Sequence, residues 1–456
     1  MIGYGISIRN SYIVAGAPGA SLTHMQAKNV TAGIMTVVLG VTVAGAAVLG
    51  VEIHGRYSDL DHGEAYSLAD PQRSLLSVTQ QSPAPVDDQA LAAALDAAAD
   101  DPVLGVIHGR VTDVTAGETV WDADSATALT PASATKVLTA AAAIHTLPAD
   151  HTLTTEAVPA ADGDTLVLKA AGDVWLDQDD VDDLAAQIAD SGQAYAQVAV
   201  DASAWTGESY LDSWDPDNVA SGYIAPMEPV MLNGARIGAT AGDVPRSPTP
   251  ARDVAQALAD RLGATVTTGV AAPAEATVVA SVESPPLRER LEHMVKWSDN
   301  VMAEAIGREI AAARGAEASF AGATDATLDA LAEQGFDVSG VTLVDNSGLS
   351  DRNLIPPALL DDVLVDAATG EELRPLLGTL PVARGVGTLE DRYADLPGRA
   401  WVRAKTGTLT GTNALAGTVI GDSGRVYTFA LLSNDGGDAL AVRRALDEFA
   451  SVLRTA

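Results

Sequence analysis

Residues Ser133 to Thr139 read S-A-T-K-V-L-T, and we expect the rest of the chain to be arranged around this stretch. Pro131 precedes it and an alanine-rich run follows it, so Ser133 is predicted at the N-terminus of a helix. Residues three apart share one helix face, which brings the Lys136 ammonium within reach of the Ser133 hydroxyl. A lysine buried among apolar residues can accept the proton of a serine, whereas an arginine cannot. The spacing therefore predicts a nucleophile and its base.

Lysine is scarce in this chain, which gives the motif more weight than S-x-x-K has alone. The pattern occurs by chance in many long chains, and a lysine one turn inside a helix is usually a solvated residue. Here there are only five lysines beside 22 arginines, at positions 28, 136, 169, 296 and 405. A GC-rich genome also favours arginine, so the scarcity indicates a role for Lys136 without establishing one.

The composition limits the possible partners. The 456 residues include 27 Lys plus Arg against 61 Asp plus Glu, a net charge of −34 that repels polyanions, so no nucleic acid is expected to bind. There is no cysteine, which excludes disulfides, thiolate catalysis and cysteine metal sites. The length, with 47% hydrophobic residues, predicts two folded units.

An apolar run near the N-terminus is long enough to cross a bilayer. Residues 30–53 carry no charge before Glu52, while Arg9 and Lys28 precede the run and several carboxylates follow it. The positive-inside rule then places residues 1–29 in the cytoplasm, a single-pass transmembrane anchor at 30–53, and the catalytic part outside the cell. Residues 54–86 are polar and aperiodic, as in a flexible linker.

Other interpretations of the N-terminal run stay open. A signal peptide cleaved near Ala44 to Ala47 would remove it, although the run is long for that purpose. Met25 is an alternative start that keeps Lys28 before the apolar run. A buried core helix is a third possibility, but the polar segment that follows offers it no partner.

Two patterns divide the remainder of the chain. Residues 87–152 and 285–456 read as one domain, interrupted by an inserted domain at 153–284 with short strands, acidic turns and a helix at Val181 to Ser191. No catalytic constellation is visible in the insertion. Its tryptophans, at positions 175, 205 and 214, are interpreted as packing residues.

A second motif lies in the helical pattern from Leu287 to Ala311, where Ser298-Asp299-Asn300 reads S-D-N. A serine close to a nucleophile can relay a proton to a leaving amine, and an asparagine amide can orient a lysine and hold a substrate carbonyl. The alternative is a simple helix cap, for which Ser, Asp and Asn are all favoured.

A third motif begins a strand near the C-terminus, where Lys405-Thr406-Gly407-Thr408 reads K-T-G-T and two further strands complete a meander. On an edge strand, Lys405 and Thr406 can bind a substrate carboxylate, and Gly407 leaves room for the substrate backbone. An ordinary surface hairpin is the competing interpretation.

S-x-x-K, S-D-N and K-T-G in this order form the motif set of class A β-lactamases and penicillin-binding proteins. The flanking stretches resemble the low-molecular-mass (class C) penicillin-binding proteins, the D-alanyl-D-alanine carboxypeptidases and endopeptidases with a domain inserted between the first two motifs. The resemblance covers about Ala90 to Leu453. One departure is A-A-G-D-V at Ala170 to Val174, where G-G-G-D-P is expected. The stretches that carry the resemblance are P-A-S-A-T-K (131–136), G-Y-I-A-P-M-E-P-V-M-L-N (222–233), the segment 284–304, D-N-S-G-L-S-D-R-N-L (345–354), L-P-V-A-R-G-V-G-T-L (380–389) and A-K-T-G-T (404–408).

This resemblance implies a fold, an activity and roles for the motif residues. The fold is α/β, with a five-stranded antiparallel sheet between helical layers. The activity is trimming of peptidoglycan stem peptides through a serine acyl-enzyme, with acylation by β-lactams. Ser133 would be the nucleophile and Lys136 its proton acceptor, Ser298 would return the proton, and Asn300 and Lys405 would order the network. Thr406, Gly407 and Thr408 would bind substrate, and the backbone N–H groups of Ser133 and Thr408 would form the oxyanion hole.

This chemistry needs no cofactor or metal, and the histidines show no metal-binding spacing. Two rival functions remain. A serine β-lactamase or esterase on the same fold would hydrolyse its penicillin adduct quickly. A non-catalytic cell-wall scaffold with a vestigial site would form no adduct.

Overall fold

The computed structural model describes residues 83–456. Its first sheet is antiparallel and five-stranded, in the order β10-β11-β12-β1-β2. Strands from both ends of the described chain therefore pair directly, β1 with β12. The strands are β1 (Val106–Asp113), β2 (Glu118–Ala123), β10 (Arg403–Leu409), β11 (Thr412–Ile420) and β12 (Val426–Asn434).

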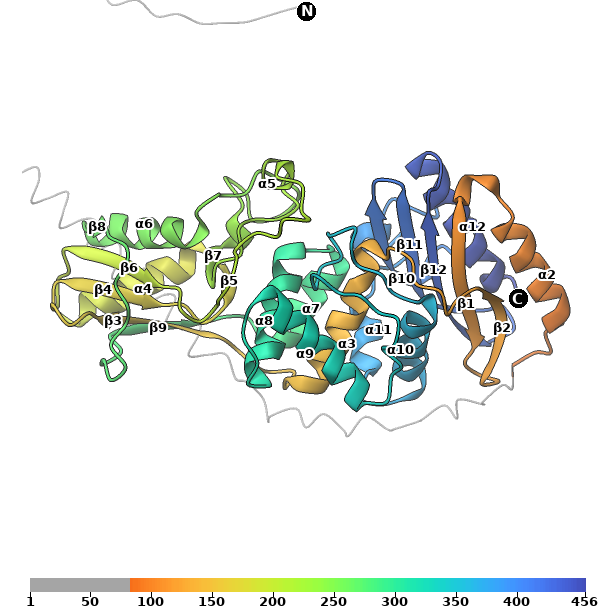
Figure 1. The fold of residues 1–456 in the computed structure, drawn as a ribbon, viewed down its shortest axis with the longest axis horizontal. Helices are drawn as coiled ribbons and strands as arrows, with labels where there is room; N and C mark the ends of the chain where they lie inside the picture. The colour runs from red at the N-terminus through yellow and green to blue at the C-terminus, as the bar shows by residue number, and fades with distance from the viewer. Residues whose placement is uncertain (1–82) are drawn as a thin grey trace, which may run out of the picture. The chain divides into compact units, whose positions relative to one another are not determined.

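Helices cover both faces of this sheet, because alternate side chains of its strands are apolar on opposite sides. On β12, Phe429 and Leu431 pack in a core with α2 and α12, whereas Ala430 and Leu432 pack in a larger core with α3, α8, α9 and α10 (Figure 1). This confirms the predicted sheet between helical layers. The helices are α2 (Asp88–Ala99), α3 (Lys136–Thr146), α7 (Leu287–Lys296), α8 (Asn300–Ala313), α9 (Phe320–Glu333), α10 (Pro357–Thr369), α11 (Arg374–Thr379) and α12 (Ala439–Arg454), with short 3-10 turns η1 (Pro102–Leu104), η2 (Ala132–Thr135) and η4 (Gly387–Leu389).

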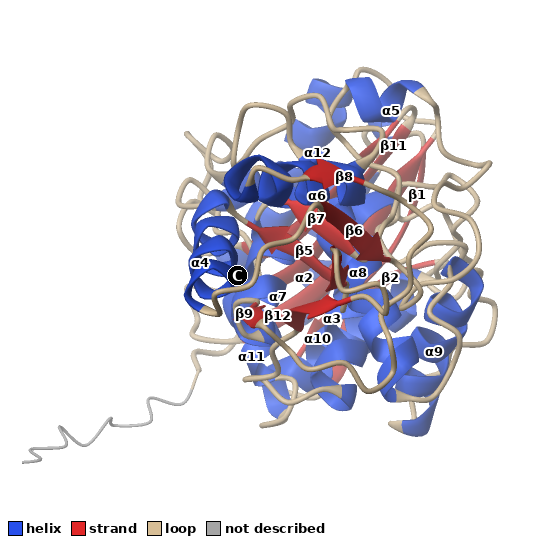
Figure 2. Ribbon diagram, turned by 90° about the vertical axis from the view of Figure 1, so that its left-hand side faces the viewer, coloured by secondary structure: helices blue, strands red, loops and turns tan. Residues whose placement is uncertain are grey.

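A second five-stranded sheet lies within residues 154–283, in the order β8-β6-β4-β3-β9. It is mixed: β4, β6 and β8 run parallel, while β3 pairs antiparallel with β4 and β9. Its core includes residues of α4 and α6 (Figure 2). The elements are β3 (Thr154–Pro159), β4 (Thr165–Lys169), β5 (Asp173–Leu176), α4 (Gln178–Asp190), β6 (Gln197–Asp201), α5 (Asp217–Ala220), β7 (Val230–Leu232), η3 (Asn233–Ala235), α6 (Pro250–Leu262), β8 (Thr265–Val266) and β9 (Ala280–Glu283), with β5 and β7 forming a separate parallel pair.

The N-terminal predictions fall outside the part of the chain that the structure describes. The cytoplasmic segment 1–29, the anchor 30–53 and nearly all of the linker 54–86 precede residue 83. Among residues 83–456, no helix combines the length and apolar character needed to cross a membrane.

Candidate active site

The nucleophile candidate lies on a tight turn. Ser133 is in η2, and the α-helix itself begins only at Lys136, three residues later than the spacing predicted. Ala132 has φ of 45°, a left-handed conformation that a non-glycine residue adopts only when its surroundings impose it. Those surroundings are close: a Cβ on Gly348 would lie 1.9 Å from the Ala132 carbonyl oxygen. The packed turn leaves the Ser133 side chain partly exposed.

Lys136 is fully buried and directs its amine at three oxygens. Its Nζ lies 3.0 Å from Ser133 Oγ, 2.6 Å from Asn300 Oδ1 and 2.6 Å from the Ser347 carbonyl oxygen. Burial lowers the pKa of Lys136 to about 8, against the opposing charges of Asp345 and other carboxylates. A substantial fraction of this lysine is therefore neutral near pH 8, as a base requires.

The S-D-N segment is both a helix cap and part of this group, so neither interpretation excludes the other. The helical pattern predicted from Leu287 to Ala311 is interrupted here, because Ser298 takes a left-handed φ of 59° between α7 and α8. Asp299 accepts from Met302 N at 2.9 Å and so caps α8. Asn300 donates from Nδ2 to the Tyr223 carbonyl at 2.9 Å, which orients its Oδ1 toward Lys136.

Lys405, on strand β10, brings the third motif to the same place. Its Nζ lies 2.9 Å from Ser298 Oγ and 2.7 Å from the Thr406 carbonyl oxygen, and its side chain is fully buried. Burial, followed by the charge of Lys136, holds the pKa of the Lys405 ammonium well below its usual range. The structure thus forms two contact groups, Ser133–Lys136–Asn300 and Ser298–Lys405, which the S-D-N segment joins because it supplies one residue to each.

The residues that follow Lys405 line the edge of the sheet. Thr406 Oγ1 lies 2.8 Å from Thr388 Oγ1, and the exposed Thr408 receives a hydrogen bond from Arg443 Nη2 at 3.2 Å. Gly407 has a role in packing in addition to the predicted one of leaving room for substrate. A Cβ there would lie 2.6 Å from the Pro131 carbonyl oxygen, so this glycine lets β10 pack against the nucleophile turn.

Asp299 anchors the S-D-N segment to residues of the 153–284 segment. Its Oδ2 lies 2.7 Å from Arg236 Nη2, 3.7 Å from Arg246 Nη2 and 3.4 Å from His293 Nε2. Burial opposes ionisation, but the hydrogen bond of His293 and the two guanidinium charges together hold the pKa of Asp299 well below its usual range. Asp299 is therefore an ionised carboxylate in a buried cluster.

The residues that support the site through the backbone or over long range could not be predicted from the sequence. Ser347 belongs to the 345–354 stretch that carried the resemblance, yet it contributes a backbone carbonyl, which residue type does not reveal. Tyr223 also acts through its carbonyl. Arg236 and Arg246 stand in the segment in which no constellation was seen, and only the fold brings them to Asp299.

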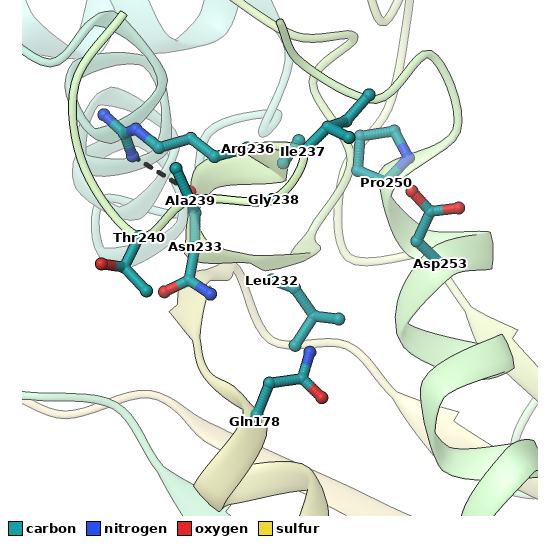
Figure 3. A pocket seen from close by; sticks show the side chains of 11 residues that line it. Gln178, Leu232, Asn233, Arg236, Ile237, Gly238, Ala239, Thr240, Pro250 and Asp253 are labelled. Carbon is teal, nitrogen blue, oxygen red and sulfur yellow. Dashed lines mark hydrogen bonds between the residues drawn. The ribbon is translucent and has the colours of Figure 1, made fainter. Parts of the chain in front are cut away.

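A separate hollow of about 360 Å³ lies beside Arg236 and contains none of the predicted site residues. Figure 3 shows Arg236 at its side, hydrogen-bonded through Nη1 to the Asn233 carbonyl, with Leu232 and Gln178 below. No group of His, Cys, Asp and Glu residues able to hold a metal ion occurs within residues 83–456.

Comparison with known proteins gives matches over most of the chain. The profile of the D-Ala-D-Ala carboxypeptidase 3 (S13) family, Peptidase_S13, matches residues 91–248 and 238–453. Carboxypeptidase DacB of Mycolicibacterium smegmatis is 43% identical over 94% of this chain and 97% of its own length. A carboxypeptidase of Mycobacterium tuberculosis is 42% identical over 79% and 83%, respectively. The crystal structure of penicillin binding protein 4 (dacB) from Haemophilus influenzae matches with a TM-score of 0.67 and 21% identity over 80% of this chain and 98% of that chain, a likeness of fold.

Proposed function

The chain belongs to the D-Ala-D-Ala carboxypeptidase 3 (S13) family of peptidases, and we propose that it trims peptidoglycan stem peptides at their terminal D-Ala-D-Ala bond through an acyl-enzyme on Ser133. The observation that carries this proposal is the position of the Lys136 amine between Ser133 Oγ and Asn300 Oδ1, 3.0 and 2.6 Å away. The two related chains, matched over 97% and 83% of their own lengths, are named carboxypeptidases, which supports a hydrolase function for this one.

In the acylation step, Ser133 Oγ attacks the carbonyl carbon between the two D-alanines while its proton passes to the neutral Lys136 amine. A lysine whose pKa lies at about 8 can make this transfer near neutral pH. The carbonyl oxygen becomes an oxyanion, which the backbone N–H groups of Ser133 and Thr408 stabilise in this mechanism. The packing of Gly407 against Pro131 supports that assignment, because it brings the two backbone segments together.

The leaving group requires a proton as the C–N bond breaks. The Ser298 hydroxyl is proposed to relay one, since it lies 2.9 Å from Lys405 Nζ. D-alanine then leaves with an amine, and Ser133 holds the remaining peptide as an ester. A water molecule next attacks the ester carbon, gives its proton to the same network, and frees the Ser133 hydroxyl.

Substrate binding is assigned to the K-T-G strand. Thr406 and Thr408 offer hydroxyls to the terminal carboxylate of the peptide, with Gly407 between them and Lys405 next to Thr406 along β10. The same positions would hold the carboxylate of a β-lactam, which acylates Ser133 by opening its ring. Cross-linked stem peptides end in a comparable amide, so endopeptidase cleavage is proposed as a second use of the site.

The proposal is tested with a stem pentapeptide ending in D-Ala-D-Ala. Residues 83–456 are expected to release D-alanine, and Ser133→Ala is expected to release none while unfolding at the same temperature. A parent protein that releases no D-alanine from monomeric or cross-linked peptides would contradict the function.

Two other functions predict different results with labelled penicillin. A serine β-lactamase or esterase on this fold would lose the label within seconds to minutes, whereas a peptidase of this family is expected to keep it for many minutes. A non-catalytic scaffold would take up no label. The buried, fully partnered Lys136 favours a working site over a vestigial one.

We also propose that the enzyme is anchored in the cell membrane by residues 30–53, with the peptidase domain (87–152 and 285–456) and the inserted domain (153–284) outside the cytoplasm. The basic residues before the apolar run and the carboxylates after it support this orientation. Protease added to intact spheroplasts should therefore remove everything beyond the linker. Full protection of the peptidase domain would show that the orientation is wrong.

A further inference from the structure

Glu304 is a buried carboxylate in the site that the mechanism above does not use. It lies on α8, one turn after Asn300, and is fully buried. Its Oε1 accepts two backbone hydrogen bonds, from Asn346 N at 3.0 Å and from Ser347 N at 2.8 Å. The same Ser347 offers its carbonyl oxygen to Lys136 Nζ at 2.6 Å. Glu304 therefore contacts Lys136 through a single residue.

This arrangement determines where the lone pair of a neutral lysine points. A charged ammonium has three N–H donors, and Lys136 faces three oxygens. After losing one proton, the amine keeps two N–H groups and gains a lone pair. If the Asn300 amide oxygen and the Ser347 carbonyl hold the two N–H groups, the lone pair faces Ser133 Oγ, which is the geometry for accepting the serine proton.

We propose that Glu304 is a positioning residue, which fixes the Ser347 carbonyl so that the neutral Lys136 amine presents its lone pair to Ser133. This inference rests on the proposed function. No bond to Glu304 forms or breaks; the proton moves only from Ser133 Oγ to Lys136 Nζ. Fixing one of the two acceptors is a matter of orientation, and small misplacements of a reacting group lower rates strongly.

Several other charges surround the two groups and act on the same equilibrium. Asp345, Asp299 and Glu304 each favour the charged form of Lys136, and Lys405 faces it from β10. Burial, then the charge of Asp345, raises the pKa of Glu304 to about 7, while the charge of Arg308 opposes the rise. Arg308 Nη1 lies 3.6 Å from Glu304 Oε2. Glu304 thus combines a geometric effect with an electrostatic one.

Two substitutions separate these effects. Glu304→Gln keeps the length of the side chain and a carbonyl oxygen that can accept both backbone N–H groups, but removes the charge. Glu304→Asp keeps the charge but is one methylene shorter, so it cannot reach both donors in place. Glu309→Gln and Glu309→Asp on the same helix are matched controls, because Glu309 is also buried and ion-paired, to Arg290, and is not among the partners of Ser347 or Lys136.

The experiment measures the second-order acylation rate by a fluorescent penicillin from pH 5 to 10, with kcat and KM for D-alanine release. Glu304→Asp should lower the plateau rate by about 100-fold through kcat rather than KM. Glu304→Gln should lower it by no more than about threefold and shift the midpoint of the pH profile, which lies near pH 8 where the parent Glu304 is ionised, to lower pH, since a lost negative charge lowers the pKa of Lys136. The Glu309 variants should keep the parent profile.

The outcomes distinguish this inference from the proposed function. If the parent is neither acylated nor releases D-alanine, the proposed function fails. If the parent is active and Glu304→Asp acylates as fast as it does, Glu304 does not position the base. A plateau for Glu304→Gln more than tenfold below the parent also overturns the inference, and this holds even if Glu304→Asp fails to fold.

Discussion

Lys136 Nζ lies 2.6 Å from Asn300 Oδ1, although 164 residues separate the two in sequence. Asn300 in turn donates a hydrogen bond from Nδ2 to the Tyr223 carbonyl, and this bond fixes the orientation of its side-chain amide. The segment between the first two motifs therefore helps to hold the proposed base. The long insertion is compatible with the site because it supplies the Tyr223 carbonyl that orients Asn300.

Replacing each motif lysine by arginine should separate their roles. Lys136→Arg keeps the charge but cannot accept a proton, because the arginine pKa exceeds about 12, and should lower acylation by about 1,000-fold. Lys405→Arg keeps the charge beside Ser298 and should retain measurable acylation. The second-order rate with one labelled penicillin measures both.

Both variants are first checked by thermal unfolding against the parent, since each lysine is fully buried. A loss at Lys405 equal to or greater than that at Lys136 would remove the case for Lys136 as the base.

The acylation rate should rise with pH, because Lys136 must lose its proton before it can act as a base. Burial lowers the pKa of this lysine from 10.5 to about 8, and only the neutral amine accepts the serine proton. The rate is therefore expected to rise with pH, to reach half its maximum near pH 8, and to level off above it. Stopped-flow acylation between pH 5 and 10 tests this, and a rate that falls between pH 6 and 8 would contradict it.

The buried cluster around Asp299 should matter for both stability and rate. Asp299→Asn can still cap α8, but leaves the Arg236 and Arg246 guanidinium groups without their carboxylate. Breaking a buried ion pair costs about 3 kcal/mol or more, and acylation should fall about tenfold as the S-D-N segment loosens. Urea unfolding and acylation rates measure the two effects.

Asp182→Asn is the control for that variant, because its ion pair with Arg261 involves an exposed carboxylate. Such a pair is worth less than about 1 kcal/mol. Equal losses of unfolding free energy in the two variants would show that the buried Asp299 cluster stabilises the fold no more than an exposed ion pair does.

Gly407→Ala should disturb the nucleophile turn from the neighbouring strand. The added methyl group would lie 2.6 Å from the Pro131 carbonyl oxygen and 3.0 Å from Ala414 Cβ. Overpacking of this kind costs about 1–3 kcal/mol, and displacement of Ser133 should slow acylation by about 100-fold.

Gly411→Ala in the same hairpin separates the two effects. Gly411 has φ of 71° and open space around its Cβ position, so alanine there is strained but touches nothing. It should cost about 1–2 kcal/mol without slowing acylation. Slow acylation in both variants would mean that general destabilisation, rather than contact with the turn, is responsible.

The side chains proposed to react could be predicted from the sequence because their chemistry depends on residue type. Ser133, Lys136 and Lys405 stand in motifs whose spacing is informative, and the structure brings them together. The parts that could not be predicted act through the backbone or over long range. Ser347 supplies a carbonyl that any residue could supply, and Arg246 reaches Asp299 only in the fold.

The observed helix boundaries differ from the predicted ones because of local contacts that the hydrophobic pattern of the sequence does not show. The helix predicted at Val181 begins at Gln178, because Asp177 and Asp180 form a capping box there. The helical pattern through Ser298 is broken by the left-handed φ of that residue, a conformation imposed by its surroundings and not by its own preference. Both departures lie at helix starts, where local contacts outweigh periodicity.

The most direct test of the central claim is to map a penicillin adduct by mass spectrometry on residues 83–456. We predict a single acylated peptide containing Ser133, stable for many minutes, and complete loss of the adduct in a Ser133→Ala variant that unfolds at the parent temperature. An adduct on any other residue, or labelling retained by Ser133→Ala, would contradict the assignment of Ser133 as the nucleophile.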